Sequence, residues 1–176
     1  MLTFDRTTTP ARTWANNMLT GSTLILDTET TGLDPAAQVI QIAIVDMQGD
    51  VMFDSLIRPS CAISPGAGVV HGITMMMLRN APTIIEVLPA LHKILGGHAV
   101  VIYNADFDTR ILRQTCAAFG QNVDWVWRMN TQCAMKMYAQ LVGGGRWQRL
   151  EGGDHTAVGD CLAVLALLKR MVNATT

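Results

Sequence analysis

Short apolar and β-branched runs, separated by turns rich in Gly, Asp and Pro, dominate the chain after a short helical pattern at its start. Residues 23–28, 39–47 and 51–57 have this composition and are predicted to be β-strands. The Gln48-Gly49-Asp50 turn between the second and third runs is short, which predicts an antiparallel hairpin.

Helical and strand patterns alternate through the rest of the chain. Helical stretches show apolar residues three and four positions apart and stop at or near glycines. The predicted helices are residues 82–95, about 106 or 107 to 119, 133–142, and a final helix that ends near residue 172; the predicted strands are residues 99–103 and 125–129. The order βββαβαβα predicts an α/β fold with a mixed five-stranded sheet flanked by helices.

The N-terminal helical pattern covers residues 10–20 and begins at Pro10, with Trp14 and Met18 one turn apart to dock it. A role as a packing appendage is the favoured interpretation. We therefore divide the chain into a short helical extension, residues 1–20, and a single domain, residues 21–176, in keeping with a total length of 176 residues.

Composition and charge exclude several classes of protein for this chain. Hydrophobic residues make up 49% of the chain, yet no apolar run reaches the roughly eighteen residues of a membrane span. Polar residues, Asp5 among them, stand where a signal peptide needs an apolar stretch, so we expect a cytoplasmic protein. A net charge of −1 argues against a large non-specific hold on nucleic acid. Binding through a local site and metal ions is the alternative that remains.

Two acids lie at the carboxyl end of the first predicted strand. Alternation along residues 23–29 places Asp27 and Glu29 on one face together with Ile25, although the strand is otherwise built for burial. Two like charges would then share one pocket, which is costly for acids without partners.

Two more acids stand at the heads of apolar helical stripes. Asp108 lies three and four positions before Ile111 and Leu112, and Asp160 lies four before Val164. The alternative for Asp108 is an ordinary first-turn acid on the helix surface, which is equally common. If all four acids converge, repulsion would raise their pKa values unless cations neutralise them. Oxygen ligands alone suit Mg²⁺ or Mn²⁺, and two ions about 4 Å apart are usual for phosphoryl transfer.

His155 is a candidate general base. Inside the final helix it would point about 140° away from Asp160, so we expect it on the loop just before that helix, free to swing toward the acids. A solvated or structural histidine remains the common alternative.

Four stretches of sequence resemble the motifs of the DEDDh 3′-5′ exonucleases, the family of the proofreading ε subunit of bacterial replicative polymerase and of exonuclease X. They are residues 25–33 (ILDTETTGL), 71–74 (HGIT), 103–112 (YNADFDTRIL) and 155–160 (HTAVGD), in the family's order, and the resemblance covers roughly residues 22–172. It implies a ribonuclease H-like fold, two Mg²⁺ or Mn²⁺ ions, and release of nucleoside 5′-monophosphates from a 3′ end.

The resemblance also implies roles for single residues. Asp27, Glu29 and Asp160 would bind metal directly, Asp108 would hold the second ion, and His155 would deprotonate the attacking water. The implied substrate contacts are Thr30 at the terminal sugar, Leu33 as a wedge under the last base, His71, Tyr103 and Asn104. For Leu33 a turn residue that covers the core is an equal alternative.

Two features depart from the family pattern. Tyr103 stands where the family often has His, which alters a contact near the scissile phosphate. A short Gly-rich loop, residues 143–154, replaces the additional helix of ε-like sequences. Arg146, Trp147 and Arg149 on this loop are suspected to hold a single strand by stacking and phosphate contact. A loop Trp docked on the sheet is the commoner outcome.

We predict a metal-dependent 3′-5′ exonuclease that acts on single-stranded DNA. An exoribonuclease is the rival in the same chemistry, and a non-catalytic nucleic-acid-binding or polymerase-accessory module is the rival from another class. A polymerase or DNA-repair partner and the oligomeric state stay open at this point.

Overall fold

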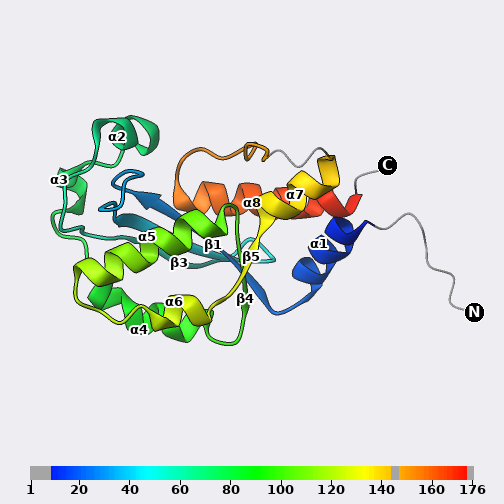
Figure 1. Ribbon diagram of the computed structural model, residues 1–176, viewed down its shortest axis with the longest axis horizontal. Helices are drawn as coiled ribbons and strands as arrows, with labels where there is room; N and C mark the ends of the chain where they lie inside the picture. The colour runs from blue at the N-terminus through cyan, green and yellow to red at the C-terminus, as the bar shows by residue number, and fades with distance from the viewer. Residues whose placement is uncertain (1–8, 144–146, 174–176) are drawn as a thin grey trace, which may run out of the picture.

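Five strands and eight helices make up the computed structural model, which describes residues 9–143 and 147–173 (Figure 1). The strands are β1 (Thr23–Thr30), β2 (Val39–Asp46), β3 (Val51–Leu56), β4 (Ala99–Ile102) and β5 (Asn130–Cys133). The helices are α1 (Pro10–Thr20), α2 (Pro65–His71), α3 (Met75–Leu78), α4 (Ile84–Leu95), α5 (Ala105–Ala118), α6 (Asp124–Arg128), α7 (Ala134–Val142) and α8 (Ala157–Asn173).

The strands form one mixed sheet in the order β3-β2-β1-β4-β5, so β1 lies in the middle. It pairs antiparallel with β2 and parallel with β4. The hairpin predicted at residues 48–50 is confirmed: β2 and β3 are antiparallel, and the side chain of Asp46 accepts hydrogen bonds from the backbone of Gln48, Gly49 and Asp50. Gly49 has a φ of 96°, a conformation that favours glycine.

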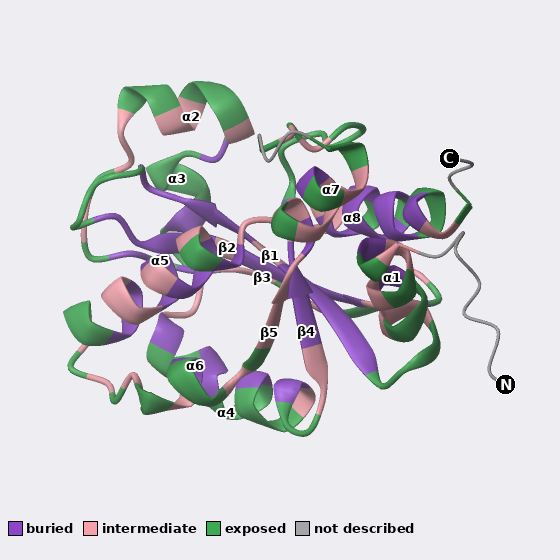
Figure 2. Ribbon diagram, turned by 45° about the vertical axis from the view of Figure 1, so that its right-hand side comes forward, coloured by how far each residue is buried: buried purple, intermediate pink, exposed green. Residues whose placement is uncertain are grey.

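Helices cover both faces of the sheet, and the two faces hold separate cores. Helices α4, α5 and α6 pack on the face that carries Leu24 and Leu26, while α1, α7 and α8 pack on the face that carries Ile25 and Val101 (Figures 1 and 2). Because β1 is largely buried on both faces, polar side chains near its carboxyl end are partly withdrawn from water. The predicted mixed five-stranded sheet flanked by helices is confirmed.

The strand predicted at residues 125–129 is wrong. Residues 124–128 form helix α6, and the fifth strand follows directly at Asn130–Cys133. Trp125, Val126 and Trp127 have high β-propensity, but the turn buries Val126 in the core and sets Trp125 edge-on against His92, with ring centroids 5.0 Å apart. Tertiary packing therefore overrides a weak local preference.

Helices α2 and α3 were not predicted, because each is too short to show a periodic pattern. Pro65 opens α2, and the side chain of Ser64 accepts a hydrogen bond from the Ala67 backbone. Among the described residues, no helix is both long enough and apolar enough to cross a bilayer.

Candidate active site

Asp27 and Glu29 lie at the carboxyl end of β1, on the face that α8 covers. Their alternation with Thr28 follows from the strand's two-residue repeat. The pairing register with β2 shifts between Glu29 and Thr30, so the strand becomes irregular just after the second acid. The shared pocket predicted for the two acids is present.

Asp160 reaches the same place from the first turn of α8. Asp154 stabilises the turn just before this helix, because its Oδ1 accepts hydrogen bonds from both the backbone N–H and the hydroxyl of Thr156. Carboxylate oxygens of Asp27, Glu29 and Asp160 all lie within 4.8 Å of one another. Segments more than a hundred residues apart in the chain thus bring three acids together.

Asp108 approaches the cluster from the opposite side of β1. It lies in the first turn of α5, is 4% exposed, and accepts a hydrogen bond of 2.7 Å from the Thr28 hydroxyl. The surface alternative for Asp108 is therefore wrong. Thr28 was missed as a site residue, although its position between two acids on a buried strand was a usable signal.

Burial raises the pKa values of all four acids, and repulsion from neighbouring cluster acids adds to this for Asp27, Glu29 and Asp108. Burial, followed by the charges of Asp108, Asp160 and Glu29, raises the pKa of Asp27 well above its ordinary value. Burial raises the pKa of Glu29 to about 8 and that of Asp108 to about 7, the latter despite the hydrogen bond from Thr28. Burial also raises the pKa of Asp160.

Divalent cations fit this set of side chains. Every ligand atom in the cluster is a carboxylate oxygen, which suits Mg²⁺ or Mn²⁺. Burial and mutual repulsion disfavour the charged forms of these neighbouring acids. A nearby positive charge would therefore stabilise their ionised carboxylates.

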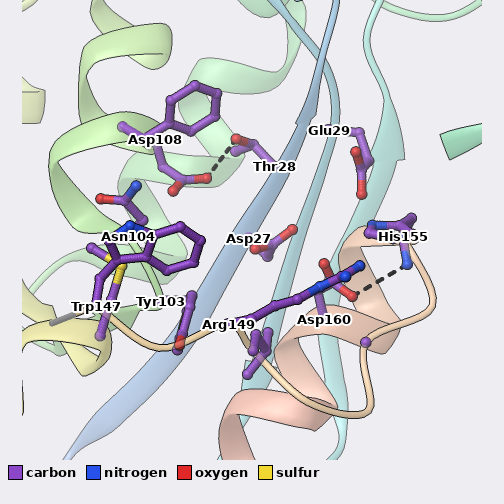
Figure 3. Close-up of a pocket in the computed structure, with 14 residues that line it drawn as sticks. Asp27, Thr28, Glu29, Tyr103, Asn104, Asp108, Trp147, Arg149, His155 and Asp160 are labelled. Carbon is purple, nitrogen blue, oxygen red and sulfur yellow. Dashed lines mark hydrogen bonds between the residues drawn. The ribbon is translucent and has the colours of Figure 1, made fainter. Parts of the chain in front are cut away.

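His155 lies on the loop before α8, as predicted, and is exposed. Its φ of 61° is unusual for a residue other than glycine, and its backbone N–H donates to Oδ1 of Asp160 at 3.3 Å. The backbone is thus tied to one acid of the cluster, and the imidazole lines the same cavity (Figure 3).

A cavity of about 390 Å³ joins these groups. Figure 3 shows the acids, His155 and the loop before α8 around it. Its lining residues are Asp27, Thr28, Glu29, Tyr103, Asn104, Phe107, Asp108, Met135, Trp147, Arg149, Leu150, Gly153, His155 and Asp160. Phe107, Met135, Leu150 and Gly153 were missed, since apolar wall residues and a glycine carry no chemical signature in the sequence.

Tyr103 and Asn104 both line the cavity where β4 leads into α5. The hydroxyl of Tyr103 donates to the backbone carbonyl of Gln148 on the loop before α8. Its interaction partner in this structure is therefore that loop.

Thr30, Leu33 and His71 are not among the residues that line the cavity. Thr30 ends β1, Leu33 follows it, and His71 ends α2. The Thr30 hydroxyl donates to the carbonyl of Gly32, and Leu33 is 77% exposed, so Leu33 does not cover the core. His71 Nδ1 accepts from the Ile73 backbone, so Nε2 carries the ring proton and donates to the Thr30 carbonyl. Both ring nitrogens of His71 are engaged within the chain.

Of the three loop residues suspected to hold a single strand, two lie within the described structure and one does not. Trp147 is 68% exposed and lines the cavity together with Arg149, so the alternative of a Trp docked on the sheet is wrong. Arg146 lies outside the residues that the structure describes.

The mixed sheet and the acidic cluster at the end of its central strand define the class: nucleases with a ribonuclease H-like fold. The family model described as Exonuclease (RNase_T) matches residues 24–168, and the chain belongs to this family. It is a 3′-5′ exonuclease of the DEDD type, as the sequence motifs predicted.

Similar proteins agree with this assignment. The chain is 33% identical to the uncharacterized exonuclease CP81 of Escherichia phage 186, over 88% of this chain and 90% of the relative. It is 29% identical to exodeoxyribonuclease 10 of Escherichia coli K12, over 86% and 69% of the two chains. A solved structure of exonuclease X in complex with 5′ overhanging duplex DNA matches with a TM-score of 0.66 and 28% identity, over 86% of this chain and 91% of the other.

Proposed function

We propose that this exonuclease removes nucleotides one at a time from the 3′ end of single-stranded DNA and releases nucleoside 5′-monophosphates. The observation that carries the proposal is the convergence of three carboxylates within 4.8 Å in a cavity that Asp108 and His155 also line. DNA is favoured over RNA because one relative is named an exodeoxyribonuclease and another is bound to DNA.

The cavity supports cleavage of one nucleotide at a time. Its volume of about 390 Å³ lies near the lower end of the range of small-molecule sites, roughly 300–1,000 Å³. A terminal nucleotide fits such a space, whereas a stacked base pair is larger. We therefore propose that the 3′ end enters as a single strand.

Asp27, Glu29 and Asp160 would hold two divalent cations, Mg²⁺ or Mn²⁺, with Asp108 on the second. Such ions, when bound, stabilise the charge that develops on the attacking and leaving oxygens of phosphoryl transfer. Thr28 keeps the Asp108 carboxylate oriented through the 2.7 Å hydrogen bond. The cations offset the repulsion that raises the pKa values of these acids.

His155 would accept the proton of the attacking water. The backbone bond to Asp160 holds its loop beside the cluster, while the imidazole is exposed and lines the cavity. Histidine is the side chain that most often serves as a general base, and an exposed imidazole can pass the proton that it accepts to solvent. Thr30, Leu33, His71 and Asn104 remain proposed substrate residues, with Leu33 as the wedge under the last base. The hydroxyl of Tyr103 donates to the Gln148 carbonyl, so the effect proposed for Tyr103 on the substrate is indirect.

A digestion panel tests the proposal. Purified protein is incubated with 3′-labelled and 5′-labelled oligonucleotides of DNA and RNA, single-stranded, blunt and overhanging, with Mg²⁺, Mn²⁺ or EDTA. Stepwise shortening of single-stranded DNA from the 3′ end, release of 5′-monophosphates and no cleavage in EDTA are expected. Asp27→Asn serves as the inactive control.

Three other results of the digestion panel would each contradict one part of the proposal. RNA shortened faster than DNA makes the protein an exoribonuclease. Cleavage that persists in EDTA removes the metal-dependent mechanism, and failure to cut any oligonucleotide that the protein binds removes the catalytic proposal.

A further inference from the structure

Residues 147–153, here called the strap, cross one side of the cavity between α7 and α8. Trp147, Arg149, Leu150 and Gly153 of the strap line the cavity (Figure 3). Leu150 also packs against the core under α8, so the middle of the strap is anchored to the domain. The strap therefore forms a wall of the site, built from residues outside the acid and histidine motifs.

Tyr103 holds the strap in place from the end of β4. Its hydroxyl donates to the Gln148 carbonyl, across 45 positions of sequence. Its own carbonyl accepts from the Met135 backbone at 2.9 Å and from the Cys133 thiol, so the tyrosine is fixed at both ends. Burial raises the pKa of Tyr103 to about 12, and the hydroxyl stays a donor at neutral pH.

A second contact is weaker. Glu151 of the strap lies 3.4 Å from Arg170 of α8, but both side chains are more than half exposed. Exposed ion pairs contribute little to stability. Of these described contacts, the Tyr103 hydrogen bond and the partial burial of Leu150 are the stronger ones that hold the strap.

Gln148 separates two side chains that suit a nucleic-acid strand. In an extended segment, residues two apart project to the same side, and both Trp147 and Arg149 line the cavity. Figure 3 shows Trp147 and Arg149 at the cavity that the acids also line. Among the described residues that line the cavity, Arg149 is the one with a permanent positive charge.

We propose that the strap is a binding subsite for a single strand of nucleic acid, in which Trp147 stacks on a nucleobase and Arg149 pairs with a phosphate, and that Tyr103 positions both. The inference rests on the proposed exonuclease function and deepens it. It accounts for a 68% exposed Trp at the cavity and for an arginine in a cavity that is also lined by a cluster of acids. It also assigns Tyr103 a positioning role rather than a direct contact with substrate.

Binding is measured separately from cleavage. Fluorescence anisotropy of a fluorescein-labelled oligothymidine, with Ca²⁺ in place of Mg²⁺, gives Kd for each variant without hydrolysis. Trp147→Ala should weaken binding about tenfold, as loss of one stacked base predicts, and Trp147→Phe should recover most of it. Trp127→Ala is the matched control, because Trp127 is 67% exposed but lies outside the cavity lining; its Kd should stay within about twofold.

Arg149 is tested through salt dependence. Loss of one phosphate contact on a single strand should reduce the slope of log K against log salt by about 0.7. Arg149→Ala should show this change, and Arg128→Ala, an exposed arginine outside this cavity, should not.

Tyr103→Phe removes only the hydroxyl that holds the strap. It should raise KM for single-stranded DNA about fivefold and leave kcat within about twofold, since one neutral hydrogen bond is lost and the acids are untouched. It should also reduce the quenching of Trp147 emission when oligothymidine binds, a signal assigned by its absence in Trp147→Phe.

Two results would overturn the inference. Equal Kd values for Trp147→Ala and Trp127→Ala would exclude base stacking on the strap. A Tyr103→Phe variant with reduced kcat and unchanged KM would make the tyrosine part of the chemical step or of the general scaffold. If wild-type protein cuts no nucleic acid, the proposed function fails, but the anisotropy measurements still decide the strap.

Discussion

Glu29→Gln should stabilise the metal-free protein at high pH. Residue Glu29 is 9% exposed. Burial, together with the charges of Asp160 and Asp108, raises the pKa of its carboxyl group from an ordinary 4.5 to about 8. At 1.36 kcal/mol per pKa unit this corresponds to at most about 5 kcal/mol of lost stability when the group is ionised. Water at the cavity mouth screens the charge, so about 2 kcal/mol is a reasonable expectation.

The pH dependence follows from the direction of the shift. Below pH 4.5 the carboxyl group is protonated in both folded and unfolded states, and the penalty is absent. It grows as pH rises from 4.5 to about 8 and is complete above that. Melting curves in EDTA should therefore show equal Tm values for wild type and Glu29→Gln near pH 4, and a variant about 4 to 8 °C more stable at pH 9.

Bound cation narrows the difference in stability between the variant and the wild type. Mg²⁺ or Mn²⁺ at a hundred times its Kd should stabilise the wild type by about 2.7 kcal/mol, and should stabilise the variant less. Asp50→Asn, which changes an exposed acid in the β2–β3 turn, is the control and should leave Tm unchanged at either pH. A Glu29→Gln variant no more stable than wild type in EDTA at pH 9 would refute the account of repulsion in the cluster.

Three other substitutions test the site and the fold. His155→Ala should lower kcat by about 10² to 10⁴ while cation and oligonucleotide affinities stay unchanged; unaltered kcat removes it from the base role. Gly153→Ala places a Cβ 2.2 Å from Oδ1 of Asp160, so kcat/KM should fall at least about tenfold without unfolding; Gly66→Ala, whose Cβ meets nothing within 4 Å, should be silent. Thr115→Val leaves the buried Val39 N–H without its 2.8 Å acceptor and should lower the free energy of unfolding, measured in urea, by about 1–3 kcal/mol. Thr115→Ser keeps the hydroxyl and should lower it less. Equal losses for the two variants would contradict this explanation.

The positions of the four clustered acids followed from local periodicity. Asp108 and Asp160 head helical stripes that the core then buries, and Asp27 and Glu29 follow a strand's two-residue alternation. These repeats are properties of single elements, so a sequence is sufficient to detect them. The same reasoning failed at residues 125–129, where β-propensity depends on neighbours that only the fold supplies.

The sequence by itself determined the longer elements, the mixed sheet, the family and the acids, because the patterns that reveal them lie within short stretches of the chain. It did not determine α2, α3 or the helix at residues 124–128. The tertiary structure decided which distant groups meet. The Thr28 hydroxyl reaches Asp108 across 80 positions, and the Tyr103 hydroxyl reaches the strap across 45. Such contacts depend on how helices and loops pack against the sheet, and periodicity along the sequence does not predict them. The orientation of the acids and the wall of the cavity are therefore consequences of packing.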